Sequence, residues 1–268
     1  MNNTISFAEI GLSFELNRAA FYIGSFPIYW YGIIIATGLI LAVLYGFHEC
    51  KKVNIDSDDL LNMLLIALPV AIISARLYYV IFSWDSYKDN LLNIFDIRSG
   101  GLAIFGGIIG ASAVVVLYCR KKKISIGKVL DILAVGLLIG QSIGRWGNFV
   151  NGEAFGSVTS LPWAMTVESD GKIIAENVHP TFLYESLWNG IGIIVLLAYK
   201  SIREYNGELF CGYLVWYGFG RMIIESLRAD SLYIGAFRIS QLLAVLCIIA
   251  GVTLILYKRL FKDIKQKK

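Results

Sequence analysis

The sequence predicts an all-α integral membrane protein with about seven transmembrane helices. Of its 268 residues, 57% are hydrophobic and only 16% are charged, and the mean hydropathy is +0.65. Several apolar runs of about 18–23 residues follow one another, each long enough to cross ~30 Å of hydrocarbon. These runs are too long and too uniformly apolar for the strands of a membrane barrel, so helices are expected. We therefore expect one membrane-embedded domain over residues 1–268.

The apolar runs set the expected positions of the spans. They are residues 28–47, 60–82, 101–119, 129–143, 183–199, 209–226 and 239–257. Residues 1–28 are amphipathic and are expected to lie on the outer membrane surface. Residues 157–178 form a second outer segment, which is polar and in which Asp170-Gly171 predicts a hairpin turn.

Short basic segments set the orientation. Lys51, Lys52, the run 120–123 and the basic tail 258–268 all fall on one side of the membrane if the spans are counted as above. The positive-inside rule makes this side cytoplasmic, so the C-terminus is expected inside and the N-terminus outside. The net charge of +4 then reflects topology and contact with membrane lipids, and no nucleic-acid partner is expected.

The cysteines and histidines do not predict a metal or a cofactor. The four cysteines are scattered without a CxxC pair, and they are interpreted as small apolar side chains. His48 and His179 are far apart in the sequence, and neither has a second histidine at the spacing of metal ligands.

One polar stretch, residues 144–156, follows directly on the apolar run 129–143. Its polar members are Arg145, Asn148, Asn151 and Glu153. Polar side chains at the edge of a bilayer are costly unless they bind a ligand or one another. Amides, a guanidinium and a carboxylate suit an anionic, oxygen-rich head group. The alternative is a polar helix end with an internal Arg–Glu pair.

The arginines on the predicted outer side divide into two groups. Arg76, Arg145 and Arg221 lie within apolar sequence, where arginine is preferred for gripping a phosphate or carboxylate with two hydrogen bonds. Arg18 and Arg98 are expected to reach the membrane interface with their long side chains. The outer side is therefore predicted to hold an anion.

A row of charges ends the sixth predicted span. On a helix, Arg221, Glu225 and Arg228 share one face at positions i, i+4 and i+7. The row could simply neutralise itself. Its net charge is nevertheless positive, which leaves one guanidinium for a ligand.

Glycines at four-residue spacing predict close helix packing in the third and fourth spans. Gly106 and Gly110 form a GxxxG pattern, and Gly136, Gly140 and Gly144 share one face of the next span. We expect these two faces to pack together and to bring Arg145 toward the start of the third span.

The stretch 144–156, Gly-Arg-Trp-Gly-Asn-Phe-Val-Asn-Gly-Glu-Ala-Phe-Gly, resembles the signature of the prolipoprotein diacylglyceryl transferases. Further similar segments are Trp30-Tyr31-Gly32, the Arg76-Leu77-Tyr78 element, His179-Pro180-Thr181-Phe182-Leu183-Tyr184-Glu185 and the Arg221-Glu225-Arg228 row. The resemblance runs from Tyr29 to about Asp230.

The sequence departs from the family at one position. Phe105 stands where the family has a histidine in a Gly-Gly-Leu-Ala-Ile-His-Gly-Gly segment. A mechanism that needs that imidazole as general base is therefore in doubt for this chain. His179 is either a displaced base or, as we favour, a local hydrogen-bonding residue.

The resemblance implies a bacterial plasma-membrane enzyme, with its site on the outer side. It would move the diacylglyceryl group of phosphatidylglycerol to the lipobox cysteine thiol in the signal peptide of a prolipoprotein, without a cofactor. Arg145 and Arg221 are expected to clamp the phosphate, and Tyr31 is implied as a functional tyrosine. The expected substrate-binding residues are Asn148, Asn151, Glu153, Gly156, Arg76, Tyr217, Glu225 and Arg228.

Within this set, Asn148 and Asn151 would orient the head group, and Glu153 and Glu225 would position the arginines. A thiol attacks as the thiolate, and nearby guanidinium groups favour that form. Tyr31 and Glu153 are both candidates to take the thiol proton.

Two other interpretations remain open. Phe105 raises the possibility of a family relative that has lost or altered this activity and binds lipid or uses another acceptor. The arginine-rich outer side would also suit a small transporter of anionic lipids, although the halves show no internal repeat.

Overall fold

The computed structural model describes residues 2–97, 100–235 and 237–266, with the side chains of the last helix up to Leu260. Arg98, expected at the membrane interface, and the tail residues Lys267 and Lys268 lie outside these ranges. The chain divides into two compact units, one comprising Met1–Tyr45 and Leu130–Lys268 and the other Gly46–Val129. Each unit is described by itself.

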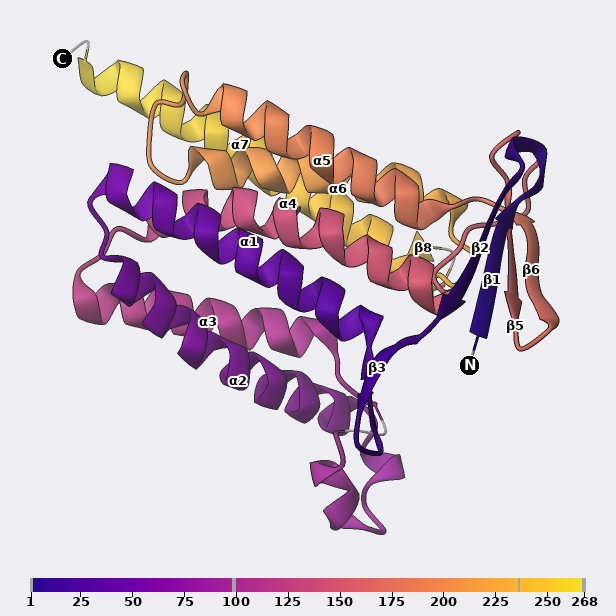
Figure 1. The fold of residues 1–268 in the computed structure, drawn as a ribbon. Helices are drawn as coiled ribbons and strands as arrows, with labels where there is room; N and C mark the ends of the chain where they lie inside the picture. Colours follow the sequence, from indigo (N-terminus) through magenta and orange to yellow (C-terminus); the bar gives the residue numbers. More distant parts are fainter. Residues whose placement is uncertain (1, 98–99, 236, 267–268) are drawn as a thin grey trace. The chain divides into compact units, whose positions relative to one another are not determined.

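Seven α-helices lie within the described residues (Figure 1). They are α1 (Trp30–Val53), α2 (Ser57–Phe82), α3 (Ile104–Lys122), α4 (Ile126–Asn151), α5 (Thr181–Tyr199), α6 (Glu208–Leu227) and α7 (Ile239–Gln266). Short 3-10 turns are η1 (Ala8–Ile10), η2 (Trp84–Ser86) and η3 (Leu91–Phe95). The strands are β1 (Asn2–Phe7), β2 (Leu12–Asn17), β3 (Ala19–Ile23), β4 (Phe26–Tyr29), β5 (Met165–Ser169), β6 (Lys172–Val178), β7 (Tyr233–Ile234) and β8 (Phe237–Arg238).

The chain is a polytopic helical membrane protein. Among the helices described, α1 to α5 and α7 are long and apolar enough to cross a membrane. The remaining helix, α6, has 20 residues but carries Arg221 and Glu225, whose side chains form an ion pair with N···O 2.7 Å. Seven spans and a cytoplasmic C-terminus therefore remain predictions.

The two predicted outer segments form one antiparallel sheet in the order β2-β1-β5-β6 (Figure 1). Side chains of β1 alternate between the two faces, and Ile5 pairs with Val167 of β5 in the buried core of this sheet. Phe149, near the end of α4, packs against the same core. The sheet thus covers the polar end of α4, an arrangement that the sequence did not predict.

The hairpin between β5 and β6 turns where it was expected. Asp170 and Gly171 have φ values of 49° and 77°, so both central residues are left-handed, as in a type I′ turn. Strands β3 and β4 form a separate hairpin, which leads directly into α1.

The predicted pairing of the two glycine faces is wrong. A methyl group on Gly106 or Gly110 would clash with Ser74 of α2, so this GxxxG face packs on α2. On α4, Gly140 lies against α1 instead, since a Cβ at Gly38 of α1 would lie 3.5 Å from Gly140 Cα. Ala42 covers Gly136, and Ile35 covers Gly144. Each small-residue face therefore has the preceding or first helix as its partner.

Candidate functional site

The signature stretch 144–156 begins as helix. Its residues up to Asn151 are the last turns of α4, so the predicted end of this helix at residue 143 is wrong by about two turns. The helix closes with a Schellman motif: the Gly152 N–H donates to the Phe149 carbonyl at 3.0 Å, and the Glu153 N–H to the Asn148 carbonyl at 3.1 Å. Gly152 has φ 64°, a conformation that glycine adopts without strain.

We expect Gly152→Ala to lower the free energy of unfolding by roughly 1–3 kcal/mol, because φ is left-handed and the new methyl group is crowded. Its Cβ would lie 2.9 Å from Val167 Cγ1 in the sheet. Gly171→Ala is the matched control, since φ is 77° there but nothing lies within 4 Å. Thermal unfolding of the purified variants in detergent measures the difference, and equal losses would show that crowding at Gly152 is unimportant.

The Schellman turn brings Glu153 back over the two asparagines of the signature. Glu153 Oε1 accepts hydrogen bonds from the side-chain amides of Asn148 at 3.0 Å and Asn151 at 3.2 Å. Asn148 Oδ1 in turn accepts from Arg145 Nη1 at 3.3 Å. Glu153, which was expected to position the arginines, is linked to Arg145 through Asn148.

Glu185 on α5 joins three arginines into what we call the arginine cluster: Arg145, Arg221, Arg228 and Glu185. Arg145 Nη2 forms an ion pair with Glu185 Oε2. Arg221 Nη1 and Arg228 Nη1 lie 3.3 and 3.4 Å from Glu185 Oε1. Arg145 comes from α4, Arg221 from α6, and Arg228 is the C-cap residue of α6. Residues far apart in the sequence are thus brought to one carboxylate.

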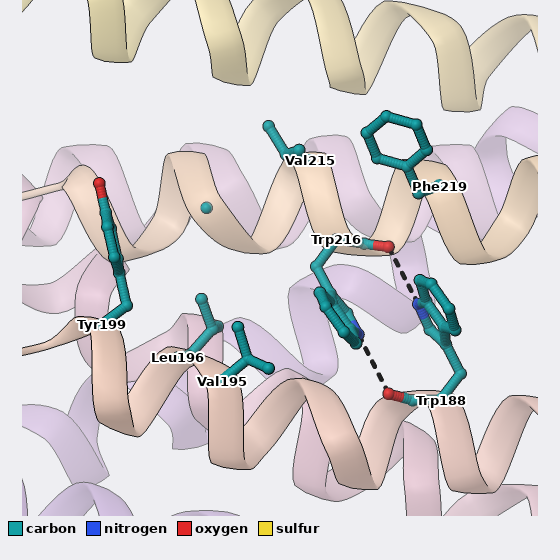
Figure 2. Close-up of a pocket in the computed structure, with 8 residues that line it drawn as sticks. Trp188, Val195, Leu196, Tyr199, Val215, Trp216 and Phe219 are labelled. Atoms are coloured by element: carbon teal, nitrogen blue, oxygen red, sulfur yellow. Dashed lines mark hydrogen bonds between the residues drawn. The ribbon is translucent and has the colours of Figure 1, made fainter.

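Two reciprocal pairs of hydrogen bonds, formed by residues that follow Glu185 within one turn, fix α5 beside α4 and α6. Between α4 and α5, the Ser142 hydroxyl donates to the Ser186 carbonyl at 2.8 Å and the Ser186 hydroxyl to the Ser142 carbonyl at 2.9 Å. Between α5 and α6, Trp188 and Trp216 each donate the indole N–H to the other's main-chain carbonyl, both at 3.0 Å (Figure 2). Together these pairs set the register that places Glu185 among the arginines.

The cluster is more nearly neutral than the sequence suggested. Arg221 Nη2 also pairs with Glu225 Oε2 at 2.7 Å, and Arg228 binds Asp230 with two hydrogen bonds of 2.9 and 2.7 Å. Arg228 thereby holds the pKa of the Asp230 carboxyl below its usual range. The guanidinium that was expected to be left over from the Arg221–Glu225–Arg228 row is balanced by Glu185 and Asp230.

The arginines nevertheless remain available to a stronger acceptor. The contacts of Arg221 and Arg228 with Glu185 are longer than the roughly 2.7–2.9 Å typical of charge-assisted hydrogen bonds. Their side chains are 17% and 12% exposed, and that of Arg145 is 27% exposed. Movement of Arg221 and Arg228 away from Glu185 would therefore break only these two long contacts.

Two tyrosines that were predicted as site residues, Tyr31 and Tyr217, lie around this cluster. The ring of Tyr31 packs on Gly147, within the α4 turn between Arg145 and Asn148, because a Cβ at Gly147 would lie 2.7 Å from Tyr31 Cδ2. Tyr217 lies within electrostatic range of Arg221, Glu185 and Arg145.

Gly156, also predicted as a site residue, packs closely against its neighbours. Its N–H donates to the His179 carbonyl at 2.9 Å, and it bridges to Arg228 in antiparallel fashion. A side chain there would lie 2.6 Å from His179 Cβ and 2.7 Å from the Leu227 carbonyl. Since its N–H is already used, Gly156 serves the site by letting the signature approach the end of α6.

Arg76 was predicted to bind substrate, and this stays a prediction, but its surroundings in the unit Gly46–Val129 favour a structural role. The side chain is 4% exposed, and all five of its N–H groups have main-chain carbonyl partners within 2.7–2.9 Å. The acceptors are Asn93, Ile94, Asp96, Gly100 and Gly101. Arg76 therefore organises the loop between α2 and α3 and has no donor left for a phosphate.

The two positions considered for a general base, His179 and Phe105, belong to different units. His179 Nδ1 lies 3.2 Å from the Tyr184 hydroxyl, which also accepts a hydrogen bond from Trp163 Nε1 at 2.7 Å. This agrees with the favoured interpretation of His179 as a local hydrogen-bonding residue. Phe105 lies in the first turn of α3 and is 37% exposed.

Sequence reasoning missed Glu185 as a site residue. Glu185 ends the quoted His-Pro-Thr segment and opens a predicted span, and a carboxylate in that position is itself a signal of function. Arg238, which was not among the site residues predicted from the sequence, donates through Nη1 to the main-chain carbonyl of Glu225. No local pattern pointed to that contact.

These features define a class: a helical membrane protein whose helices hold a cluster of guanidinium and carboxylate groups beneath a small sheet. Residues 18–257 match the sequence model of a family described as "LGT: Prolipoprotein diacylglyceryl transferase". The chain belongs to the prolipoprotein diacylglyceryl transferase family.

Several similar proteins carry the name phosphatidylglycerol–prolipoprotein diacylglyceryl transferase. One from Finegoldia magna is 48% identical over 247 residues, which cover 91% of this chain and 97% of the relative. One from Listeria monocytogenes serotype 4b is 45% identical over 251 residues, 91% of each chain. One from Bacillus cereus strain G9842 is 44% identical over 251 residues, 91% of this chain and 93% of the relative.

Proposed function

We propose that this protein transfers the diacylglyceryl group of phosphatidylglycerol to the lipobox cysteine thiol of prolipoproteins. The reaction would take place at the outer face of the bacterial plasma membrane. The observation that carries the proposal is the convergence of Arg145, Arg221 and Arg228 on Glu185, beside the asparagines of the signature. The names of the similar proteins supply the two substrates.

The reaction needs what such a cluster can provide. The thiolate sulfur attacks the glycerol carbon that bears the phosphate ester, and a C–S bond forms as the C–O bond breaks. The electron pair leaves with the oxygen of glycerol phosphate, so the phosphate changes from a monoanion to a dianion. Guanidinium groups already in place stabilise that developing charge in a poorly hydrated site.

Arg145 and Arg221 are assigned to the leaving phosphate. They come from different helices and reach the two oxygens of one carboxylate, so a phosphate placed beside Glu185 could bind both. Asn148 and Asn151 are assigned to the glycerol head group, and Glu153 fixes their amides. The thiol proton would pass to Tyr31 or Glu153. Guanidinium groups near the sulfur favour the thiolate form.

The test is an assay with purified protein, phosphatidylglycerol and a peptide containing a lipobox cysteine. We expect the mass of the peptide to rise by one diacylglyceryl unit, and no product with a Cys→Ser peptide. Complementation of a transferase-deficient bacterium is the test in cells. Lipid binding or lipid flux in proteoliposomes without a covalent product would overturn the proposal in favour of a lipid-binding relative or a transporter.

Phe105→His tests whether a general base is missing. We expect turnover to change by less than about tenfold, because the arginine cluster itself favours the thiolate. General-base catalysis contributes roughly 10²–10⁴-fold, so a rise of that size would show that this chain lacks a base its family uses. Phe105→Asn in the same assay controls for replacing the ring with a polar group.

A further inference from the structure

An apolar groove of about 270 Å³ lies between α5 and α6 (Figure 2). Along these two helices, its lining residues follow those of the arginine cluster. Its lining is formed by Trp188, Val195, Leu196, Tyr199, Gly212, Val215, Trp216 and Phe219. No charged residue contributes to this lining, and nothing in the proposed reaction uses it.

The groove exists because one position on α6 has no side chain. A Cβ at Gly212 would lie 3.2 Å from Leu196 Cδ2 and 4.0 Å from the ring of Tyr199, so a larger side chain would fill the space. Val195 is 40% exposed and Phe219 is 43% exposed, so the groove opens to the surroundings of the helices. In a membrane-spanning pair of helices those surroundings are lipid chains.

The stacked indoles of Trp188 and Trp216 form the end of the groove that is nearer the cluster. Their ring centroids are 4.5 Å apart, and the mutual hydrogen bonds hold them in place (Figure 2). Trp188 follows Glu185 by one helical turn on α5, and Phe219 precedes Arg221 on α6. Along the two helices, the arginine cluster is therefore followed by an apolar groove. This order matches the anionic head group and the acyl tail of a lipid.

The dimensions of the groove fit one lipid chain. From Trp188 to Tyr199, α5 rises roughly 16 Å, which is close to half of the ~30 Å hydrocarbon core and thus the depth of one leaflet. The volume lies just below the ~300 Å³ at which pockets begin to hold drug-sized ligands, so the groove is assigned to a single chain. Tyr199 bounds the far end, where its hydroxyl donates to Glu208 Oε1 at 2.7 Å.

We propose that this groove holds one acyl chain of the anionic glycerophospholipid whose phosphate binds the arginine cluster. The identity of the head group rests on the proposed function, whereas occupation of the groove does not depend on turnover. Because Tyr199 is fixed at the far end, the groove also limits how long a chain can lie within it.

The experiment uses the full chain in nanodiscs with phosphatidylglycerol that carries a diazirine near the methyl end of one acyl chain. After illumination, we expect cross-links on residues of α5 and α6 that line the groove, located by mass spectrometry of peptides. Gly212→Leu and, independently, Val195→Phe should reduce this labelling by at least about tenfold, equivalent to losing the burial of ~2 methylene groups. Ile194→Phe is the control, since Ile194 is 69% exposed and lies outside the groove.

Labelling spread evenly over lipid-facing helices, or unchanged in both filled variants, would overturn the proposal. Equal labelling by phosphatidylcholine with the same diazirine would overturn the link between the groove and the arginine cluster. If the unaltered protein fails to lipidate the peptide but still shows labelling in the groove, the proposed function is contradicted and the groove assignment is supported.

Discussion

Glu185→Gln should abolish measurable transfer and lower stability at the same time. Glu185 is 7% exposed and is shared by Arg145, Arg221 and Arg228. Removing one partner of a buried ion pair costs about 3–5 kcal/mol, because the remaining charges stay buried without compensation. Without the central anion, the guanidinium groups repel one another and leave the positions that suit a phosphate. Turnover with phosphatidylglycerol and the lipobox peptide should fall by roughly 10²-fold or more, the usual effect of misplacing one charge-stabilising donor.

Glu208→Gln is the matched control for this effect. Glu208 is a fully buried carboxylate at the start of α6, where it pairs with Arg259 and accepts a hydrogen bond from Tyr199. We expect Glu208→Gln to reduce the thermal midpoint by a similar amount but to keep transfer at temperatures where the protein is folded. If activity and stability fall in parallel in both variants, Glu185 has no role beyond folding.

Arg76→Ala should unfold or loosen the loop between α2 and α3 without a direct effect on lipid binding. The variant leaves main-chain carbonyls of that loop without the guanidinium donors that now satisfy them. A buried acceptor without a partner costs about 1–3 kcal/mol, so the summed loss exceeds that of an ordinary substitution. Limited proteolysis should show rapid cleavage within residues 83–103. Arg76→Lys should rescue only in part, because an ammonium group cannot match the planar fork.

The opposite result would support the substrate-binding role that the sequence predicts for Arg76. If Arg76→Ala resists proteolysis like the unaltered protein while KM for phosphatidylglycerol rises about tenfold, a binding loss of ~1.4 kcal/mol, then Arg76 contacts the lipid.

The sequence predicted the helices well wherever hydrophobicity alone defines them. It failed at the end of α4, where Arg145 and Asn148 interrupt the apolar pattern although the chain stays helical to Asn151. The side chains that lower the hydropathy there are paired across space, with Glu185 and Glu153, and pairing cannot be read from local pattern. The sheet was missed for a related reason, since β1 finds β5 only after more than half of the chain has intervened.

The sequence indicated which charged side chains to consider, but it did not indicate how the fold arranges them. Arg145 and Arg221 were chosen from their apolar surroundings, and the fold brings both to one carboxylate. The same reasoning also singled out Arg76, whose guanidinium is bound by main-chain carbonyls of a loop. Which of these acceptors an arginine meets depends on how a loop folds, and composition does not encode that.

The arginine clamp is tested most directly by the mass of a lipobox peptide after incubation with phosphatidylglycerol and three purified variants. Arg145→Ala and Arg221→Ala each remove one guanidinium from the cluster, and Arg259→Ala removes one from the ion pair with Glu208. We predict no added diacylglyceryl unit with the first two variants and a clear added unit with the third. Unimpaired lipidation by folded Arg145→Ala or Arg221→Ala would contradict the assignment of these arginines to the phosphate.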